Sequence, residues 1–152
     1  MVGAIQGGNN MYSAIDVAKY VIWYCSKKGY AVSNLKLQKM LYFIQAEFLV
    51  KRSSRCFIDR IEAWGLGPVV PRIYDEYKKY GSAEIPSKGF DTASMKIKRT
   101  DQARINKVVD KCSKYSASAL VEITHRQDPW KRVYRKYENN EITPDSIRAY
   151  FA

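Results

Sequence analysis

The sequence offers few residues whose types and spacing could support catalysis. His125 is the only histidine, so a Ser/His/Asp or Cys/His arrangement has a single candidate base, and no nucleophile lies in a recognisable local signature. Paired carboxylates occur at Asp75-Glu76 among basic residues of a predicted helix, where a solvated charged face explains them. We therefore expect no enzyme, no catalytic residue and no cofactor, and we interpret His125 as ending a helix, where it can donate to free carbonyls.

Cysteine and glycine spacing gives no sign of a metal or nucleotide site. Cys25, Cys56 and Cys112 are odd in number, widely separated and without a CxxC pair, which disfavours a disulfide framework and a zinc site. Gly65 and Gly67 lack the later glycine of GxGxxG and the GK[ST] ending of a phosphate loop, so we interpret them as a tight turn ahead of a helix. We expect reduced thiols in a cytoplasmic protein and no bound metal.

Basic charge gathers in the middle of the chain. The formal net charge is +11, and residues 77–115 carry +6 of it. A phosphate backbone or an acidic protein surface could dock there, although a solvated basic face without a partner explains the same pattern. Our candidate nucleic-acid-binding residues, on a loop and on the outer face of the helix that follows it, are Lys96, Lys98, Arg99, Arg104, Lys107 and Lys111.

The elements that must position these residues are expected to form one domain. A chain of 152 residues, 46% hydrophobic and 27% charged, is typical of a protein with a single core. We expect residues 1–11 to be a flexible lead-in without a signal peptide, and residues 12–152 to form the domain. The longest apolar run, Tyr20–Cys25, is far shorter than the roughly 20 residues that cross a bilayer, so we expect no membrane span.

Hydrophobic periodicity and capping signals predict a mainly α protein, a compact bundle of about six helices with at most a small two- or three-stranded β element. The broadest apolar surface follows a cap at Ser33 or Asn34, which predicts a central helix. Polar residues of that helix, such as Gln38 and Gln45, must reach solvent or find partners inside. Further helix starts are predicted at Ser13, Pro68, Asp101, Ser116 or Ser118, Asp128-Pro129 and Thr143-Pro144.

The remaining segments are predicted to be extended chain and loop. Cys56–Trp64 alternates in part and is predicted as a short strand or an extended arm. Gly81–Thr100 has the composition of a loop, with one small strand around Met95 and Ile97. We expect the helix that begins at Pro68 to end at about Tyr80, before this loop.

Three separated blocks of sequence resemble a known family. They read NLKLQKMLYF at residues 34–43, EAWGLGPVVPRIY at 62–74 and TH…PW at 124–130. In this order they resemble the Panacea, or SocA-like, antitoxin domain, also described as a phage-associated protein family, over roughly residues 12–151. The resemblance implies a mainly helical antitoxin domain that neutralises a cognate toxin by direct protein contact, with action as a proteolytic adaptor as a variant mode.

The resemblance also implies where a partner would bind. Among the matching positions, Leu37, Leu41 and Trp130 are core by pattern, whereas polar groups could line a groove beside the turn at Trp64–Pro68. The residues for which we expect partner contact are Gln38, Lys39, Tyr42, Trp64, Gly67, Pro68 and His125. The basic balance of the chain departs from the acidic character of many antitoxins and favours an acidic surface on the toxin.

Two alternatives to an antitoxin stay open at this point. A nucleic-acid-binding regulator would use the basic region at 77–115 and would lose affinity steeply with added salt. An enzyme with His125 as its base would lose its activity, but not its fold, in the His125→Ala variant.

Overall fold

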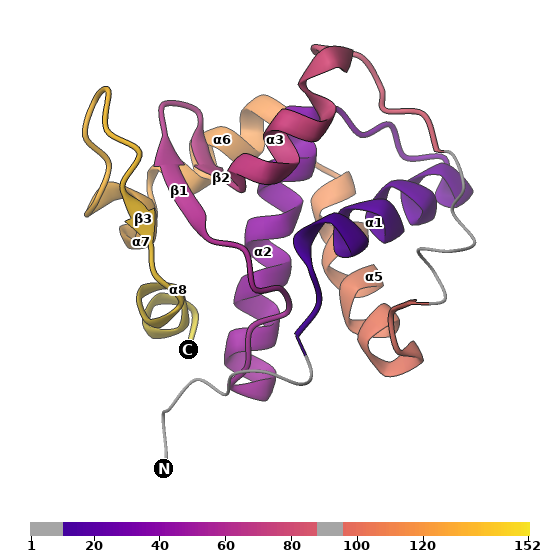
Figure 1. Cartoon of the computed structure of the whole chain (residues 1–152), viewed down its shortest axis with the longest axis horizontal. Coiled ribbons are helices and arrows are strands. Elements are labelled where there is room, and N and C mark those ends of the chain that lie inside the picture. The colour runs from indigo at the N-terminus through magenta and orange to yellow at the C-terminus, as the bar shows by residue number, and fades with distance from the viewer. Residues whose placement is uncertain (1–10, 88–95) are drawn as a thin grey trace.

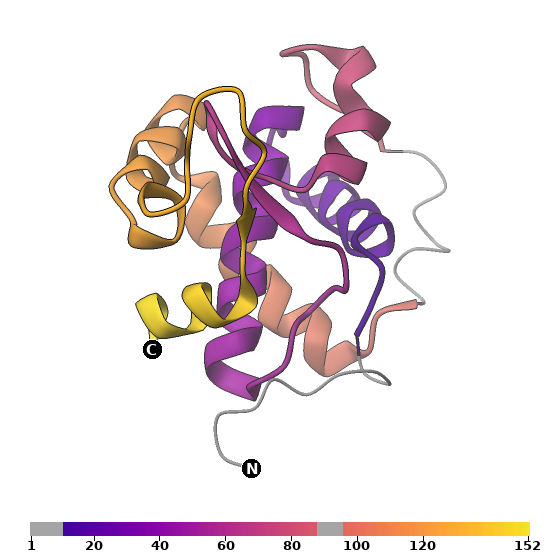
Figure 2. The same cartoon turned by 60° about the vertical axis from the view of Figure 1, so that its left-hand side comes forward.

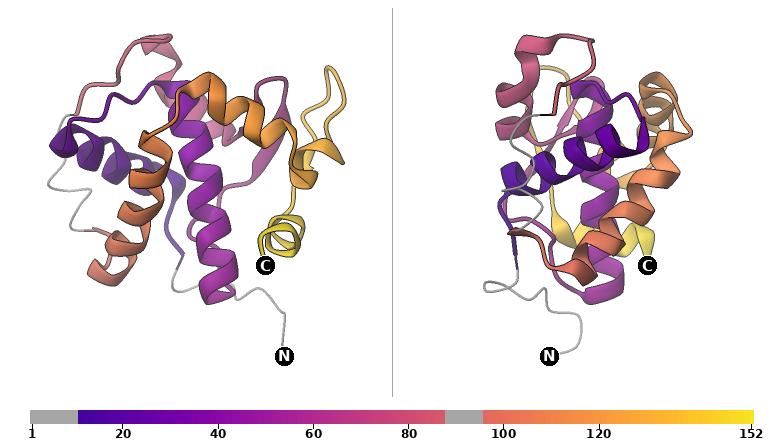
Figure 3. Two further views of the ribbon diagram at one scale, coloured as in Figure 1. Left: turned by 180° about the vertical axis from the view of Figure 1, so that it is seen from behind. Right: turned by 90° about the vertical axis from the view of Figure 1, so that its right-hand side faces the viewer.

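The computed structural model of the protein describes residues 11–87 and 96–152. Helix α2 (Asn34–Arg52) runs through the middle of the molecule, and residues on all its sides are buried. The other α-helices of the described residues are α1 (Ala14–Lys28), α3 (Pro71–Tyr77), α5 (Arg99–Ser113), α6 (Ala117–His125), α7 (Asp128–Lys131) and α8 (Pro144–Phe151). Five of them, α1, α3, α5, α6 and α8, contact α2 directly. Seen from behind, α5 and α8 flank α2 and α6 crosses one end of it (Figure 3).

A small antiparallel sheet lies against α2 (Figures 1 and 2). Its strands are β1 (Ile61–Trp64), β2 (Gly67–Val69) and β3 (Glu141–Ile142), in the order β2-β1-β3. Trp64 pairs with Gly67, so Gly65 and Leu66 form a two-residue turn between β1 and β2. The predicted fold class, mainly α with a small β element, is therefore confirmed.

Four predicted helix starts are held by the expected side-chain caps. The hydroxyl oxygens of Ser13, Ser33, Ser116 and Thr143 each accept a hydrogen bond from a backbone N–H in the first turn. Such a bond satisfies one of the N–H groups that a helix start leaves without an intrahelical partner. These boundaries could be predicted because capping is a local interaction.

The predicted cap at Asp101 is wrong. Helix α5 begins at Arg99, with Lys98 as its N-cap. Asp101 is buried in the first turn, where it accepts a hydrogen bond from the Tyr12 hydroxyl and pairs with Arg52. A carboxylate that can bind a guanidinium and a phenol from distant segments is used there rather than at the helix end, because those charge-assisted contacts are the stronger ones.

Two further segments differ in detail from the prediction. The stretch predicted as a strand or arm over Cys56–Trp64 forms a strand only from Ile61, and its earlier part is held by an isolated bridge between Phe57 and Tyr12. The helix start predicted at Pro68 is wrong: Pro68 pairs with Ala63 in β2, and helix α3 begins at Pro71. Helix α3 ends at Tyr77 and continues as a 3-10 helix, η1 (Lys78–Tyr80), to the predicted end.

Some predictions fall outside the described residues. The small strand expected around Met95 lies partly there, and residues 96–98 do not form a strand. The lead-in expected over residues 1–11 is also outside this range apart from Met11. Within the described ranges, no helix combines the length and the apolar character that crossing a membrane requires.

Candidate partner-binding site

Several polar residues of α2 are buried and hold other segments in place. The Gln38 Oε1 atom accepts a hydrogen bond from Val70 N at 2.9 Å, and its Nε2 atom donates to Asn34 Oδ1 at 2.8 Å. Asn34 in turn donates to the carbonyl of Tyr74 at 3.2 Å. Gln38 thereby satisfies a backbone N–H at the start of α3 and fixes the link between β2 and α3.

Lys39 is fully buried and points at β2. Its ammonium group donates to the Pro68 carbonyl at 2.9 Å. A Cβ atom at Gly67 would lie 2.9 Å from Lys39 Cε and 2.8 Å from Thr124 Oγ1, so the glycine leaves the space that the lysine occupies. Because burial disfavours the charged amine, it lowers the pKa of Lys39 to about 7.

Tyr42 completes this buried set on α2. Its hydroxyl donates to Gln127 Oε1 at 2.8 Å, between α6 and α7. Burial raises the pKa of the Tyr42 hydroxyl well above its usual value. Gln38, Lys39 and Tyr42 were predicted to contact a partner, but all three are covered by this chain's own segments. In this conformation their side chains do not form part of the molecular surface; they hold in place the segments that do.

The turn between β1 and β2 is fastened to the C-terminal end of α6 and to α7. His125 Nε2 lies 2.9 Å from the Gly65 carbonyl oxygen and donates to it, because a carbonyl can only accept. Trp130 Nε1 donates to the Trp64 carbonyl at 2.8 Å. His125 is thus the last residue of α6, as predicted, and its Nε2 atom makes a long-range hydrogen bond to the hairpin.

An aromatic stack supports these two hydrogen bonds. The rings of His125 and Trp130 stack with centroids 4.1 Å apart, and Trp130 stacks on Tyr134 at 4.6 Å. On the other side of the hairpin, the Trp64 ring meets Tyr74 edge to face at 5.0 Å. Planar side chains with few rotatable bonds hold a short hairpin with little loss of conformational freedom.

The hairpin presents an apolar side chain to solvent. Leu66 is 58% exposed, and Gly65 beside it is exposed as well, whereas Gly67 and Pro68 are buried. We call this group, the exposed Gly65 and Leu66 with the half-buried Trp64 and His125, the hairpin-tip surface. Leu66 was not singled out from the sequence, because the stretch from Gly65 to Gly67 was interpreted only as a tight turn ahead of a helix. A leucine in a two-residue turn cannot join the core, and this position in the sequence would have indicated an exposed apolar side chain.

Two of the six predicted basic residues form ion pairs with carboxylates of this chain, and the other four are exposed. Lys96 pairs with Asp16 at 3.5 Å, and Arg104 pairs with Glu47 at 3.6 Å. Lys98 and Arg99 are exposed at the start of α5. Lys107 and Lys111 are exposed farther along α5, one helical turn apart, beside a groove that α5 shares with α2, α6 and α8.

The fold and the site together define a small helical domain that holds a short hairpin rigidly at its surface. The chain belongs to the family described as antitoxin SocA-like, Panacea domain, whose model matches residues 37–131. This match confirms the resemblance seen in the sequence. The matched range covers most of α2, the hairpin, and the α6–α7 segment that fastens it.

A curated relative agrees with the family. The chain is 30% identical over 109 residues to antitoxin SocA of Caulobacter vibrioides (strain NA1000 / CB15N), an alignment that covers 65% of this chain and 58% of that protein. The chain therefore spans a little over half the length of this relative. No solved structure gives a significant match.

The buried amine of Lys39 predicts a pH dependence of stability. Between about pH 7 and the higher pKa of an unfolded lysine, the unfolded chain binds a proton that the folded chain has released, so the free energy of unfolding rises with pH. Raised thiol pKa values of Cys25 and Cys112, both to about 12, act in the opposite direction. The difference between wild type and Lys39→Met isolates the lysine.

From pH 7 to pH 9.5 we expect this difference to shift by about 3 kcal/mol in favour of the wild type, at roughly 1.4 kcal/mol per pKa unit. Urea denaturation of both proteins at the two pH values measures it. Lys19→Met, at an exposed position of α1, is the matched control. A difference between wild type and Lys39→Met that stays constant with pH would contradict the prediction.

Proposed function

We propose that this protein is an antitoxin that acts in the cytoplasm, neutralising a cognate protein toxin by binding it directly. Membership of the SocA-like, Panacea domain family supports an antitoxin role. In this proposal the pre-folded domain covers a functional surface of the toxin and no chemical turnover takes place. A domain that binds without rearranging loses little conformational freedom on association.

We propose the hairpin-tip surface as the contact, and the exposed Leu66 on a rigid turn is the observation that carries this choice. Apolar and aromatic side chains that are fixed before binding are typical centres of binding energy in protein interfaces. Leu66 stands on a turn whose two adjoining carbonyls are both bound by ring N–H groups. The buried residues Gln38, Lys39 and Tyr42 have a positioning role in this proposal.

Growth rescue tests the proposal. The wild-type chain is expressed together with the product of the adjoining toxin gene, and we expect growth to be restored and a stable complex to be purified. In Leu66→Asp we expect rescue to be lost, because a charge buried in an apolar contact costs about 2–4 kcal/mol of binding, roughly 100-fold in affinity. The thermal unfolding midpoint of the variant should stay close to that of the wild type.

Ile58→Asp provides the matched control. Ile58 is 54% exposed, close to the 58% of Leu66, and lies in the segment between α2 and β1. This variant makes the same chemical change elsewhere on the surface and should still restore growth. If the wild type neither binds the toxin nor restores growth, the proposed function is wrong; if Leu66→Asp restores growth fully, the proposed contact is wrong.

A further inference from the structure

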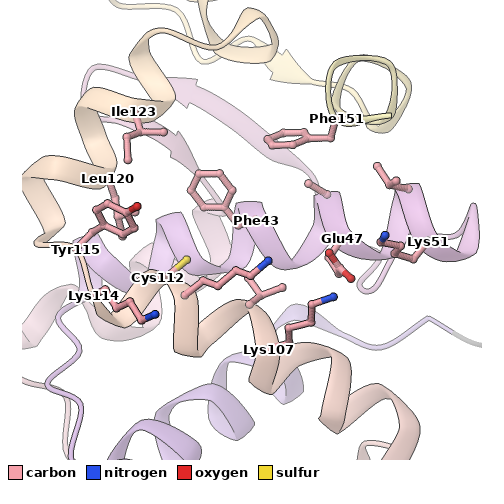
Figure 4. Close-up of a pocket in the computed structure, with 14 residues that line it drawn as sticks. Phe43, Glu47, Lys51, Lys107, Cys112, Lys114, Tyr115, Leu120, Ile123 and Phe151 are labelled. Atoms are coloured by element: carbon pink, nitrogen blue, oxygen red, sulfur yellow. The ribbon is translucent and has the colours of Figure 1, made fainter.

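The structure contains a groove that none of the hairpin-tip residues lines. It has a volume of about 510 Å³ and lies between α2, α5, α6 and α8. Figure 4 shows Phe43 of α2 and Phe151 of α8 facing it, with Leu120 and Ile123 of α6 along one side. Tyr115, 48% exposed, stands at the end near α6. The floor of the groove is therefore largely aliphatic and aromatic.

Four lysines surround this apolar floor. Lys107 and Lys111, four residues apart, follow one face of the C-terminal part of α5, and Lys114 is the C-cap residue of that helix. Lys51 lies near the end of α2. Among the described residues, no carboxylate forms an ion pair with any of their ammonium groups. The acidic residue in the lining, Glu47, is paired with Arg104 at 3.6 Å. The rim therefore carries an excess of positive charge.

We propose that this groove receives an acidic amphipathic helix of the protein that the domain neutralises, an inference that rests on the proposed function. The apolar face of such a helix would cover Phe43 and Phe151, and its acidic flank would meet the lysines. Phosphate backbones fit the groove less well, because they would leave its apolar floor in contact with water. Helices α5 and α8, which flank α2 (Figure 3), both contribute residues to the lining of the groove.

A synthetic peptide tests the groove in the isolated protein. The probe is a fluorescein-labelled helix of about 16 residues, long enough to form helix in part, with a leucine stripe flanked by glutamates. Fluorescence anisotropy should detect binding, and we expect the charge-reversed double variant Lys107→Glu/Lys111→Glu to weaken it at least about 10-fold. Lys19→Glu/Lys27→Glu makes the same charge change on exposed positions of α1 and should leave affinity within about 2-fold.

Neutralisation of the toxin provides the second readout. The double variant should lose growth rescue while keeping the wild-type unfolding midpoint, and Lys107→Gln/Lys111→Gln, which removes charge without reversing it, should fall between the two. If the wild type rescues growth and the lysine variants rescue it equally well, the groove inference is overturned while the proposed function stands. Failure of the peptide to bind the wild type, or tighter binding of a short DNA duplex at the same lysines, also overturns it.

Discussion

Replacing Gln45 with alanine is expected to lower the free energy of unfolding by about 3–5 kcal/mol, a large part of the roughly 5–15 kcal/mol that holds a domain folded. Gln45 is buried on α2 and makes three hydrogen bonds to the chain beyond that helix. Its Oε1 atom accepts from Cys56 N at 2.8 Å and from Phe57 N at 3.1 Å, and its Nε2 atom donates to the Phe57 carbonyl at 3.0 Å.

The size of this effect follows from the backbone groups that lose their hydrogen-bond partner when Gln45 is replaced. In the alanine variant two N–H groups and one carbonyl lose their partners inside the protein, and each such group costs about 1–3 kcal/mol unless water reaches it. The cavity left by the side chain adds to the loss. Urea denaturation followed by circular dichroism measures the change.

Gln45→Met separates the two contributions. Methionine fills a similar volume but offers no strong donor or acceptor, so we expect most of the destabilisation to persist. A methionine variant as stable as the wild type would show that packing, and not the three hydrogen bonds, accounts for the effect. The loop that Gln45 holds also leads into β1, so both variants should weaken growth rescue in proportion to the unfolded fraction.

The second large effect is expected at Gly67, where Gly67→Ala should cost about 2–4 kcal/mol of stability. Gly67 has a φ of +104°, a backbone conformation that side chains with a Cβ rarely adopt. The added methyl group would also lie within 3 Å of Thr124 Oγ1 and Lys39 Cε, both in buried side chains. Backbone strain and steric overlap therefore act together at this position.

Gly29→Ala is the control that isolates the strain. Gly29 also has a positive φ, +76°, but nothing lies within 4 Å of its added Cβ. We expect this variant to lose only about 1–2 kcal/mol, the cost of the left-handed conformation. Equal losses at the two glycines, measured by urea denaturation, would show that the overlap at Gly67 is relieved by small shifts.

A double variant checks the steric part directly. Thr124→Ala removes the Oγ1 atom that the new methyl group would approach, and should restore part of the stability of Gly67→Ala. The hydroxyl of Thr124 otherwise donates only to the Val121 carbonyl of its own helix at 2.9 Å. Additive losses in the double variant would contradict the predicted clash.

Much of the fold followed from local sequence signals. Four of the predicted helix caps, the central position of α2 and the turn at Gly65-Leu66-Gly67 depend on interactions between residues close in the chain, which a pattern can reveal. The family resemblance rested on the same kind of local blocks. Asp101 was misassigned because a carboxylate that is able to cap a helix is also able to bind Arg52, and only the fold brings Arg52 near.

By itself, then, the sequence determined the helices, the turn and the family, whereas the tertiary structure decided which polar residues are buried. Gln38, Lys39 and Tyr42 look available in the sequence, yet α2 is surrounded on all sides, and burial forces each of them to bind a group 29 to 85 residues away. Leu66 is exposed for the complementary reason. Its turn projects beyond the paired strands, where no element in the described part of the chain covers its side chain, and a local sequence pattern carries no information about such long-range cover.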